Sequence, residues 1–470
     1  MKRTKIICTM GPNTNDKKLM KDMAIAGMDV ARFNFSHGDY EEHLGRLNIL
    51  REVREETGKH VAALLDTKGP EIRTGLLEGG QKVTLVAGNE YTLTINECVG
   101  NDKKGFINYS GLNEDVKAGD KILIDDGLIA LEVINVDGPD IHTRVLNGGE
   151  LGEKKGVNVP GVSIKLPALT QKDIEDIKFA CDNGFDFIAA SFIRNGDAVR
   201  QIREILKEKG STIQIISKIE NQEGIENMDD IIEASDGIMV ARGDMGVEIP
   251  YERLPAIQKD LITKCRLLGR RVITATEMLE SMINNPRPTR AEASDVANAV
   301  YDGTSAIMLS GETAAGHYPI QAVEAMSKIA ENTEQNINYK KRFYSGDFII
   351  KNEPDAISHA TCGMAIDIEA KAIVACTISG MTARLVSRFR GPVDIIGLTT
   401  DEKTWRKLAL SWGVIPKMCE RFESTDVLFY SAKKVAEETL QLCKGDKLVI
   451  TGGIANGVSG STNLIKVENI

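Results

Sequence analysis

Short runs of apolar residues alternate with longer stretches of helical periodicity over roughly the first 340 residues. Runs rich in Val, Ile and Ala are typical of buried strands, and each is followed, directly or after an insertion, by an amphipathic pattern such as Asp16–Ala26. The eight predicted strands are Lys5–Thr9, Val30–Ser36, Val61–Thr67, Phe185–Ser191, Ile213–Ile219, Gly237–Gly243, Arg271–Thr276 and Ser305–Ser310. Eight such units predict an α/β fold built on a (β/α)8 barrel, the TIM barrel.

The third predicted strand is not followed by its helix. Residues 70–168 hold 15 of the 43 glycines and alternate short β-patterned runs with turn signals such as Asp126-Gly127. This pattern predicts a small all-β barrel domain inserted into the TIM barrel. The barrel pattern resumes at Thr170, a predicted N-cap.

A second series of strands and helices begins near residue 345, with predicted strands at Ala372–Ser379, Val393–Thr399, Val414–Met418, Lys447–Thr451 and Leu464–Val467. Five strands are too few for a barrel, so we expect an open-sheet α/β domain with three layers. The predicted domains are 1–69 with 169–344 for the barrel, 70–168 for the insertion and 345–470 for the C-terminal domain.

The chain is acidic, with a formal net charge of −10 from 58 Lys and Arg against 68 Asp and Glu. A basic surface for nucleic acid is therefore not expected. No apolar stretch reaches the ~18 residues of a membrane span, and Gly11 and Pro12 interrupt any signal peptide. The eight scattered cysteines lack metal spacing and indicate reduced thiols, so we expect a cytoplasmic protein.

Unusual polar residues follow the second and third predicted strands. Period-two alternation places Arg32, Asn34 and Ser36 on one face of the second strand. The third strand ends with Asp66 and Thr67, and Arg73 follows shortly after. In a TIM barrel the carboxyl ends of the strands form the active site, so these side chains should converge there.

Three later strands end in the same way. Lys218 and Glu220 share one face of the fifth strand, Asp244 follows the sixth beside Gly243, and Thr276 ends the seventh. Two carboxylates on adjacent strands suit a hard divalent cation such as Mg²⁺. Gly243 would let backbone N–H groups approach an anion.

Each of these residues also has a structural interpretation. Lys218 and Glu220 could form a simple ion pair, Arg32 or Arg73 alone is often a structural cation, and Asp244 could cap a turn. The coincidence of polar residues at the same end of five strands favours a functional site. Two Arg, a Lys and a metal with oxygen ligands are the recurring means of neutralising a transferring phosphoryl group.

Six motifs, in this order, resemble the pyruvate kinase family over essentially the whole chain. They are Met10-Gly11-Pro12, Arg32–Gly38, Leu65–Arg73, Ile216–Gly224, Met239–Glu248 and Asn285–Glu292. The resemblance implies transfer of the phosphoryl group of phosphoenolpyruvate to ADP, followed by protonation of the enolate to pyruvate. ATP is the second product.

The resemblance also implies the cation ligands. Glu220 and Asp244 would hold Mg²⁺ or Mn²⁺. A potassium ion would be held by a set of oxygen ligands from Asn34, Ser36, Asp66 and the Thr67 carbonyl. Glu71, in place of a Lys found in some members, implies that activity depends on potassium.

The roles of the remaining site residues follow from the same resemblance. Arg32, Arg73, Lys218 and Thr276 would be catalytic; Arg32, Lys218, Gly243, Asp244 and Thr276 would bind the substrate; and Asn34, Ser36, His37, Arg73 and Lys155 would contact the nucleotide. Lys218 would stabilise charge on the phosphoryl group and the enolate, while Thr276 would help a water deliver the proton. Glu277 stands where many members have Gln, and strand alternation predicts that it points outward.

The family resemblance further implies a mobile lid in the inserted domain and a homotetramer. In the C-terminal domain, Thr377, Ser379, Gly380 and Thr382 run from a strand end into a helix start, which suits either a phosphate or ordinary helix capping. The family uses this loop, with a second near residues 460–462, for a phosphorylated effector such as fructose 1,6-bisphosphate. The effector's identity stays open.

Two other functions remain possible at this stage. Lys218 could act as a Schiff-base nucleophile in a lyase, which would need a depressed pKa, whereas Glu220 and Asp244 should keep the amine charged. A non-catalytic sensor of phosphorylated metabolites would keep the C-terminal loop and lose part of the active-site set, which is complete here.

Overall fold

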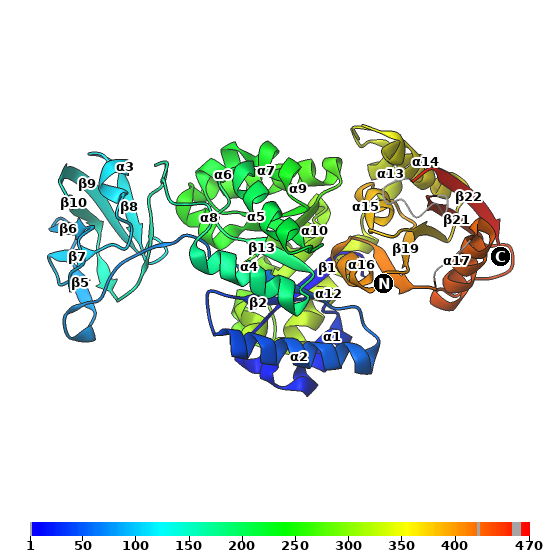
Figure 1. The fold of residues 1–470 in the computed structure, drawn as a ribbon, viewed down its shortest axis with the longest axis horizontal. Helices are drawn as coiled ribbons and strands as arrows, with labels where there is room; N and C mark the ends of the chain where they lie inside the picture. Colours follow the sequence, from blue (N-terminus) through cyan, green and yellow to red (C-terminus); the bar gives the residue numbers. More distant parts are fainter. Residues whose placement is uncertain (1, 421–423, 454–461) are drawn as a thin grey trace.

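Eight parallel strands close into the predicted barrel at the centre of the molecule (Figure 1). The computed structural model describes residues 2–420, 424–453 and 462–470. Around the barrel the strands run β1 (Lys5–Met10), β17 (Ala306–Leu309), β16 (Arg271–Ala275), β15 (Gly237–Ala241), β14 (Gln214–Ile219), β13 (Phe187–Ala190), β3 (Ala62–Asp66) and β2 (Val30–Asn34). The predicted TIM barrel is confirmed.

Helices cover the outside of the barrel in the order expected from the sequence. The main ones are α1 (Lys17–Ala26), α2 (Tyr40–Thr57), α4 (Gln171–Asn183), α5 (Gly196–Glu208), α7 (Met228–Ala234), α9 (Leu254–Leu268), α10 (Arg290–Asp302) and α12 (Pro319–Gln335). Thr170 caps α4, as predicted, by accepting a hydrogen bond from the Asp173 N–H. Short helices α6 (Gln222–Glu226) and α8 (Arg242–Glu248) extend two of the strand ends.

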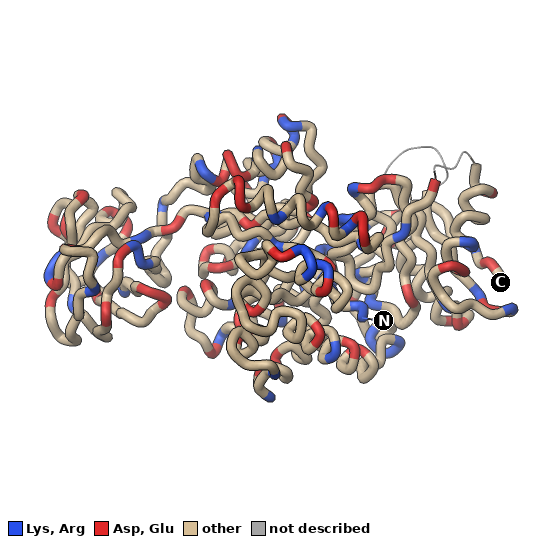
Figure 2. Tube along the Cα trace, turned by 90° about the horizontal axis from the view of Figure 1, so that it is seen from below, with Lys and Arg blue, Asp and Glu red and all other residues tan. Residues whose placement is uncertain are grey.

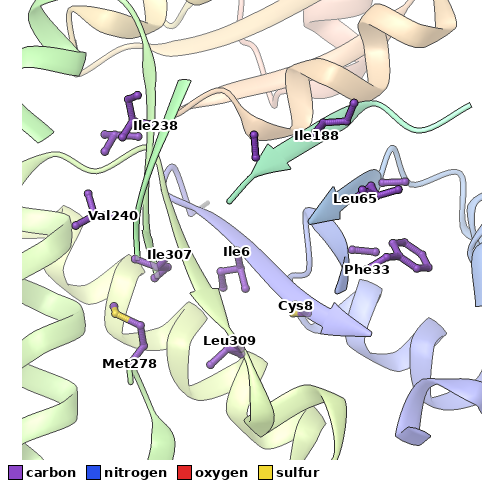
Figure 3. Close-up of a cluster of buried hydrophobic side chains, with 14 of the residues drawn as sticks. Ile6, Cys8, Phe33, Leu65, Ile188, Ile238, Val240, Met278, Ile307 and Leu309 are labelled. Carbon is purple, nitrogen blue, oxygen red and sulfur yellow. The ribbon is translucent and has the colours of Figure 1, made fainter. Parts of the chain in front are cut away.

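Alternate residues of each strand enter two different cores. Outward side chains such as Ile6, Phe33 and Leu65 pack against the surrounding helices (Figure 3). Inward side chains such as Val30 and Ile216 fill the barrel. Burial on both faces explains why the strands have continuous apolar sequences instead of alternating ones.

The barrel interior is completed by the C-terminal domain. Ala409 and Leu410, both fully buried, join the inward-facing cluster from a short 3-10 helix at Leu408–Leu410. They lie in a segment about a hundred residues beyond the last barrel strand, β17. The amino end of the barrel is therefore closed by another domain.

The inserted domain, at one end of the elongated molecule, consists mainly of β-strands with one short helix, α3 (Leu112–Asp115) (Figure 1). Its main sheet has the order β4 (Ile72–Arg73), β12 (Gly156–Asn158), β8 (Lys121–Ile124), β9 (Ile129–Asp137), β10 (Asp140–Asn147), β6 (Glu90–Thr94) and β7 (Lys104–Phe106). An isolated bridge between Thr74 and Ile107 links the two edge strands, so the sheet curls into the predicted small barrel. A separate ladder joins β5 (Val83–Leu85) and β11 (Gly149–Leu151).

The C-terminal domain is an open five-stranded sheet, as predicted. Its order is β20 (Val414–Met418), β19 (Asp394–Thr399), β18 (Ala372–Cys376), β21 (Lys447–Gly452) and β22 (Leu464–Asn469), with β22 antiparallel. Buried residues of α14 (Glu353–Asp367) and α15 (Met381–Arg388) pack on one face. Those of α17 (Thr425–Thr439) pack on the other, which gives three layers.

Charged residues of both signs are interspersed along all three domains (Figure 2). None of the described helices has the length and apolar character needed to cross a bilayer.

Candidate active site

The polar residues predicted at the strand ends continue the inward-facing rows of the barrel. On β2 the row Val30, Arg32, Asn34 changes from apolar to polar at the carboxyl end. The rows on β3 and β14 change in the same way at Asp66 and at Lys218. Period-two alternation therefore brings residues from separate strands into one polar layer above the apolar core.

Asp66 is the centre of a buried charge network in this layer. Its Oδ2 accepts from Arg32 Nε at 2.6 Å, and its Oδ1 accepts from Lys218 Nζ at 3.2 Å. Lys218 Nζ also lies 2.8 Å from Glu220 Oε1. Asp66 and Glu220 are fully buried, and Arg32 and Lys218 are each 8% exposed. The structure brings together four predicted site residues from three strands.

The network controls which of these groups carry charge. Burial alone would lower the pKa of Lys218, but Asp66, Glu220 and Asp244 raise it above its usual value. Burial would raise the pKa of Asp66, but the cations Lys218 and Arg32 hold it below its ordinary range. Both groups are therefore charged at neutral pH, as the predicted role of Lys218 requires.

Glu220 differs from Lys218 and Asp66 in that its pKa lies close to neutral pH. Burial, together with the negative charge of Asp244, raises its pKa to about 7, although Lys218 opposes the shift. Its Oε2 accepts from the Phe192 N–H at 2.6 Å, while the buried Oε1 contacts the Lys218 ammonium at 2.8 Å. A buried carboxyl with a raised pKa, close to a second carboxylate, suits a bound cation.

The donor set decides which cation would fit. Among residues 2–420, 424–453 and 462–470, no group of three or more His, Cys, Asp and Glu is arranged to hold a metal. Glu220 and Asp244 are a pair, and Asp244 lies exposed in the first turn of α8. One or two carboxylates completed by water and substrate oxygens are typical of Mg²⁺. The residues present fit that ion.

The predicted monovalent-cation ligands come from the carboxyl ends of β2 and β3. Asn34 and Ser36 form a tight turn after β2, in which Asn34 Oδ1 accepts from the Ser36 N–H at 3.1 Å. The Phe35 N–H donates to the Asp66 carbonyl at 2.9 Å, which ties this turn to the end of β3. Neutral oxygens grouped around one carboxylate fit a large monovalent cation, for which hard oxygen ligands are suitable.

Thr276 has a backbone conformation that strand alternation did not predict. β16 ends at Ala275, and Thr276 and Glu277 have φ values of 68° and 52°. A β-branched residue in the left-handed region is a conformational outlier of the kind found at functional sites. Glu277 is exposed, and because its backbone is left-handed, strand alternation does not determine the direction of its side chain.

The same loop engages the predicted substrate donor. The Gly243 N–H donates to Thr276 Oγ1 at 2.8 Å, and Gly243 lies inside α8, which begins at Arg242. The predicted sixth strand therefore stops at Ala241, two residues earlier than expected.

Arg242 is a functional-site residue that the sequence reasoning missed. Its guanidinium donates to the Thr276 carbonyl at 2.6 Å and forms two contacts of 2.7 and 2.8 Å with the carboxylate of Asp295 on α10. These bonds hold the strained Thr276 backbone in place. In the segment Arg242-Gly243-Asp244, the sequence predicts roles for the glycine and the aspartate only.

Arg73 and Lys155, which are predicted to contact the nucleotide, are each paired with a carboxylate. Arg73 contacts Glu71 at 2.7 Å, and Lys155 contacts Asp125 at 3.0 Å. Both cations line a cleft of about 560 Å³ between the lid and the barrel, which Asp244 also lines. His37 is exposed directly after the turn formed by Asn34 and Ser36, and it does not line this cleft.

The lid is also held directly to the barrel. Asn158 of β12 donates to Glu248 of α8 at 2.7 Å. The hydrogen bond therefore joins the lid to the short helix that contains Asp244.

The fourth strand contributes residues that were not predicted. Ser191 and Phe192 follow β13 and contact Lys218, Asp66 and Glu220. The sequence contained a usable signal, because Phe187, Ala189 and Ser191 continue an inward row like those of β2 and β3.

The predicted effector residues lie at the start of α15. Gly380 is its N-cap, with φ of 81° and no side-chain capping bond. Thr382 is 5% exposed, and its Oγ1 lies 2.7 Å from Oγ1 of Thr462. The two loops named in the prediction therefore meet at this pair, although residues 460 and 461 lie outside the described residues.

The barrel, its buried Arg–Asp–Lys–Glu network and the lid cations together define an enzyme that acts on anionic, phosphorylated substrates. Comparison with known proteins identifies which one. Residues 1–323 match the family model "Pyruvate kinase, barrel domain", and residues 355–468 match "Pyruvate kinase, alpha/beta domain". The chain belongs to the pyruvate kinase family, whose phosphotransferase reaction passes the phosphoryl group of phosphoenolpyruvate to ADP and yields pyruvate and ATP.

Individual relatives agree over the full length. A pyruvate kinase of Clostridium acetobutylicum is 50% identical, with 100% of this chain and 99% of the relative aligned. A pyruvate kinase of Staphylococcus aureus is 49% identical, and the alignment covers 100% of this chain and 80% of that longer protein. A crystal structure of a pyruvate kinase from Cryptosporidium parvum superposes with a TM-score of 0.94 at 41% identity, covering 100% of this chain and 96% of that one.

Proposed function

We propose that the buried network of Arg32, Asp66, Lys218 and Glu220 is the catalytic centre for phosphoryl transfer and enolate protonation. The observation that carries this proposal is the position of Lys218 Nζ between two buried carboxylates, 3.2 Å from Asp66 and 2.8 Å from Glu220. These charges keep the ammonium protonated. A fixed cation at this point stabilises charge on the phosphoryl group and on the enolate that it leaves.

The other residues bind, orient and transfer a proton. Arg32 and Arg73 neutralise phosphate oxygens. The N–H groups of Gly243 and Asp244 receive the substrate carboxylate after Thr276 Oγ1 withdraws from Gly243, to which it is 2.8 Å away. The freed Thr276 hydroxyl then orients the water that protonates the enolate.

A Lys218→Met variant tests the assignment. In a lactate-dehydrogenase-coupled assay with phosphoenolpyruvate, ADP, Mg²⁺ and K⁺, we expect kcat to fall by at least about 10³-fold. Lys407→Met is the matched control, because Lys407 is 7% exposed against 8% for Lys218 but lies at the opposite end of the barrel. Comparable rates for wild type and Lys218→Met would refute the proposed role.

Two alternative functions are less well supported. A Schiff-base nucleophile needs a neutral amine, whereas the carboxylates around Lys218 raise its pKa. Borohydride in the presence of a carbonyl substrate should therefore leave Lys218 unmodified. A non-catalytic sensor would not need the complete set of strand-end residues that lies around Asp66.

We further propose that Glu220 and Asp244 hold Mg²⁺ or Mn²⁺, which would neutralise phosphate charge when bound. Asn34, Ser36, Asp66 and the Thr67 carbonyl would hold K⁺. Glu71, which pairs with Arg73 at 2.7 Å, supports a potassium requirement, because a carboxylate at this position supplies no cation of its own. Replacing K⁺ with Na⁺ should strongly reduce activity, and equal rates in the two salts would contradict the assignment.

Nucleotide binding is proposed for the cleft between lid and barrel. Asn34, Ser36, His37, Arg73 and Lys155 would contact ADP. Arg73 and Lys155 already line the cleft, where Glu71 and Asp125 hold them until a nucleotide phosphate competes for the same cations. Closure of the lid over this cleft would exclude water from the reaction.

Regulation is proposed at the start of α15. Thr377, Ser379, Gly380 and Thr382 would bind the phosphate of an effector such as fructose 1,6-bisphosphate. Thr382→Glu would place a negative charge beside Thr462, whose hydroxyl is 2.7 Å from that of Thr382. Activation should be lost while the basal rate is retained, whereas unchanged activation would exclude the site.

Assembly and location are inferred from the family. A homotetramer is expected, and the mass in solution tests it. All eight cysteines are free, which is consistent with the predicted cytoplasmic location.

A further inference from the structure

The end of β13 lies between the two proposed cation sites. Ser191 is 4% exposed and contacts Asp66 and Thr67, both proposed as potassium ligands. The next residue, Phe192, donates its N–H to Glu220, the proposed divalent-cation ligand, at 2.6 Å. Two consecutive residues therefore contact both ligand sets.

The hydroxyl of Ser191 has a defined orientation. Lys218 Nζ lies 2.8 Å from Ser191 Oγ, and an ammonium can only donate, so Ser191 accepts there. The single hydroxyl proton of Ser191 is then left for the Thr67 carbonyl at 2.6 Å or for Asp66 Oδ1 at 3.2 Å. The shorter contact favours Thr67. Ser191 thus joins the catalytic ammonium to a potassium ligand through one oxygen atom.

The backbone around Ser191 leaves it little freedom. Its N–H donates to Thr67 Oγ1 at 3.1 Å, and Phe192 has a left-handed φ of 54°. Gly69 packs so closely that a Cβ at this position would lie 2.7 Å from the Phe192 ring and 2.9 Å from Ser191 Cβ. A rigid support of this kind holds the hydroxyl within hydrogen-bonding distance of both partners.

We propose that Ser191 is a positioning residue that couples the monovalent-cation site to Lys218. Cation binding at Asp66 and Thr67 fixes the partner of the Ser191 proton, and the Ser191 oxygen in turn fixes the ammonium of Lys218. Monovalent-cation affinity and the position of Lys218 thereby depend on each other. This inference rests on the proposed function, because it uses the assigned potassium ligands.

The test compares Ser191→Ala, which removes the hydroxyl, with Ser191→Thr, which retains it. Ser217→Ala is a matched control, since Ser217 is fully buried on the adjacent strand β14. Within the described part of the chain, its hydroxyl forms a hydrogen bond only with Ser235 Oγ, 2.6 Å away. Potassium binding is measured as the KCl dependence of the melting temperature at constant ionic strength. The potassium activation constant is measured in the coupled assay.

We expect Ser191→Ala to need about tenfold more K⁺ in both measurements, as is typical when a residue supporting a metal ligand is lost. Ser191→Thr and Ser217→Ala should stay within about twofold of wild type. A lower melting temperature without a change in the potassium constants would show a merely structural role and overturn the proposal.

A second measurement keeps the test decisive if Ser191→Ala is unstable. Coupling is reciprocal, so Lys218→Met should also shift the potassium dependence of melting, which needs no activity. In the double variant Ser191→Thr with Lys218→Met, the shift should equal that of Lys218→Met alone. An unchanged potassium dependence in Lys218→Met would overturn the coupling.

The proposed potassium site and the role of Ser191 can be refuted separately. A wild-type protein that responds equally to K⁺ and Na⁺ in both measurements would refute the proposed potassium site itself. A wild type that responds to K⁺, with Ser191→Ala indistinguishable from it, would refute only the role of Ser191.

Discussion

The two ends of the barrel each hold a buried lysine, in opposite electrostatic environments. At the carboxyl end, Asp66 and Glu220 raise the pKa of Lys218 although burial opposes it. At the amino end, burial lowers the pKa of Lys407 to about 8, although Asp186 and Asp401 oppose the shift. The hydrogen-bond partners of Lys407 are the carbonyl and hydroxyl of Thr212, at 2.7 and 2.8 Å. One ammonium is held by carboxylates and the other by neutral oxygens.

One arginine at each end shows the same contrast. Arg32 at the carboxyl end pairs with Asp66, whereas Arg271 at the amino end donates to the Lys407 carbonyl and to Ser411. Cations paired with carboxylates can exchange those partners for anionic substrates. Cations that satisfy carbonyl groups hold a domain interface together and offer no charge to a ligand. Substitutions at the two ends should therefore separate activity from stability.

Of the three further tests of this contrast, Glu220→Gln should have the largest effect. This isosteric change removes a proposed metal ligand, and kcat should fall by at least about 10²-fold. Stability at pH 7.5 should not fall, because the raised pKa of about 7 shows that the fold disfavours the charged carboxylate. Coupled assays and urea unfolding measure the two quantities. The exposed Glu233→Gln is the control, and loss of stability in parallel with activity would contradict the distinction.

The second effect concerns the closed end of the barrel. Leu410→Ala should lower the free energy of unfolding by about 3 kcal/mol, the usual cost of a cavity at a fully buried leucine. The rate per folded molecule should remain within about twofold of wild type, because Leu410 lies at the end away from the strand-end residues. Denaturant unfolding and active-site-normalised kinetics test this, with half-exposed Leu76→Ala as the control. A loss of rate at full stability would mean that the two ends are coupled.

The barrel and the strand-end residues could be predicted from sequence because both follow local periodicity. Buried parallel strands have continuous apolar runs, and Arg32, Asp66 and Lys218 interrupt those runs at equivalent positions. The chain order of the runs then fixes which ends meet. The closing segment at Ala409 and Leu410 could not be predicted in this way, since its partners lie in another domain and no local pattern encodes that contact.

The site details that were missed have physical causes. The side-chain directions of Thr276 and Glu277 depend on a left-handed backbone, which period-two alternation does not describe. The strand prediction also ran past Ala241, where α8 begins and Arg242 turns toward Thr276. Ser191 could have been predicted, because it continues the alternating row of Phe187 and Ala189 at the end of the fourth strand.

The smallest expected effect is that of Lys407→Met on the pH dependence of the free energy of unfolding. The pKa of Lys407 in the folded protein, about 8, is below the ordinary lysine pKa of 10.5, so the unfolded chain binds more protons between these values. Wild-type stability should therefore rise with pH across this window and be lost as pH falls through it. Lys407→Met lacks this group, and other lysines and cysteines titrate equally in both proteins. From pH 7 to pH 9 we expect the wild type to gain roughly 1 kcal/mol relative to the variant in urea unfolding. Parallel pH profiles would show that Lys407 keeps an ordinary pKa, and the electrostatic contrast between the two ends of the barrel would then be lost.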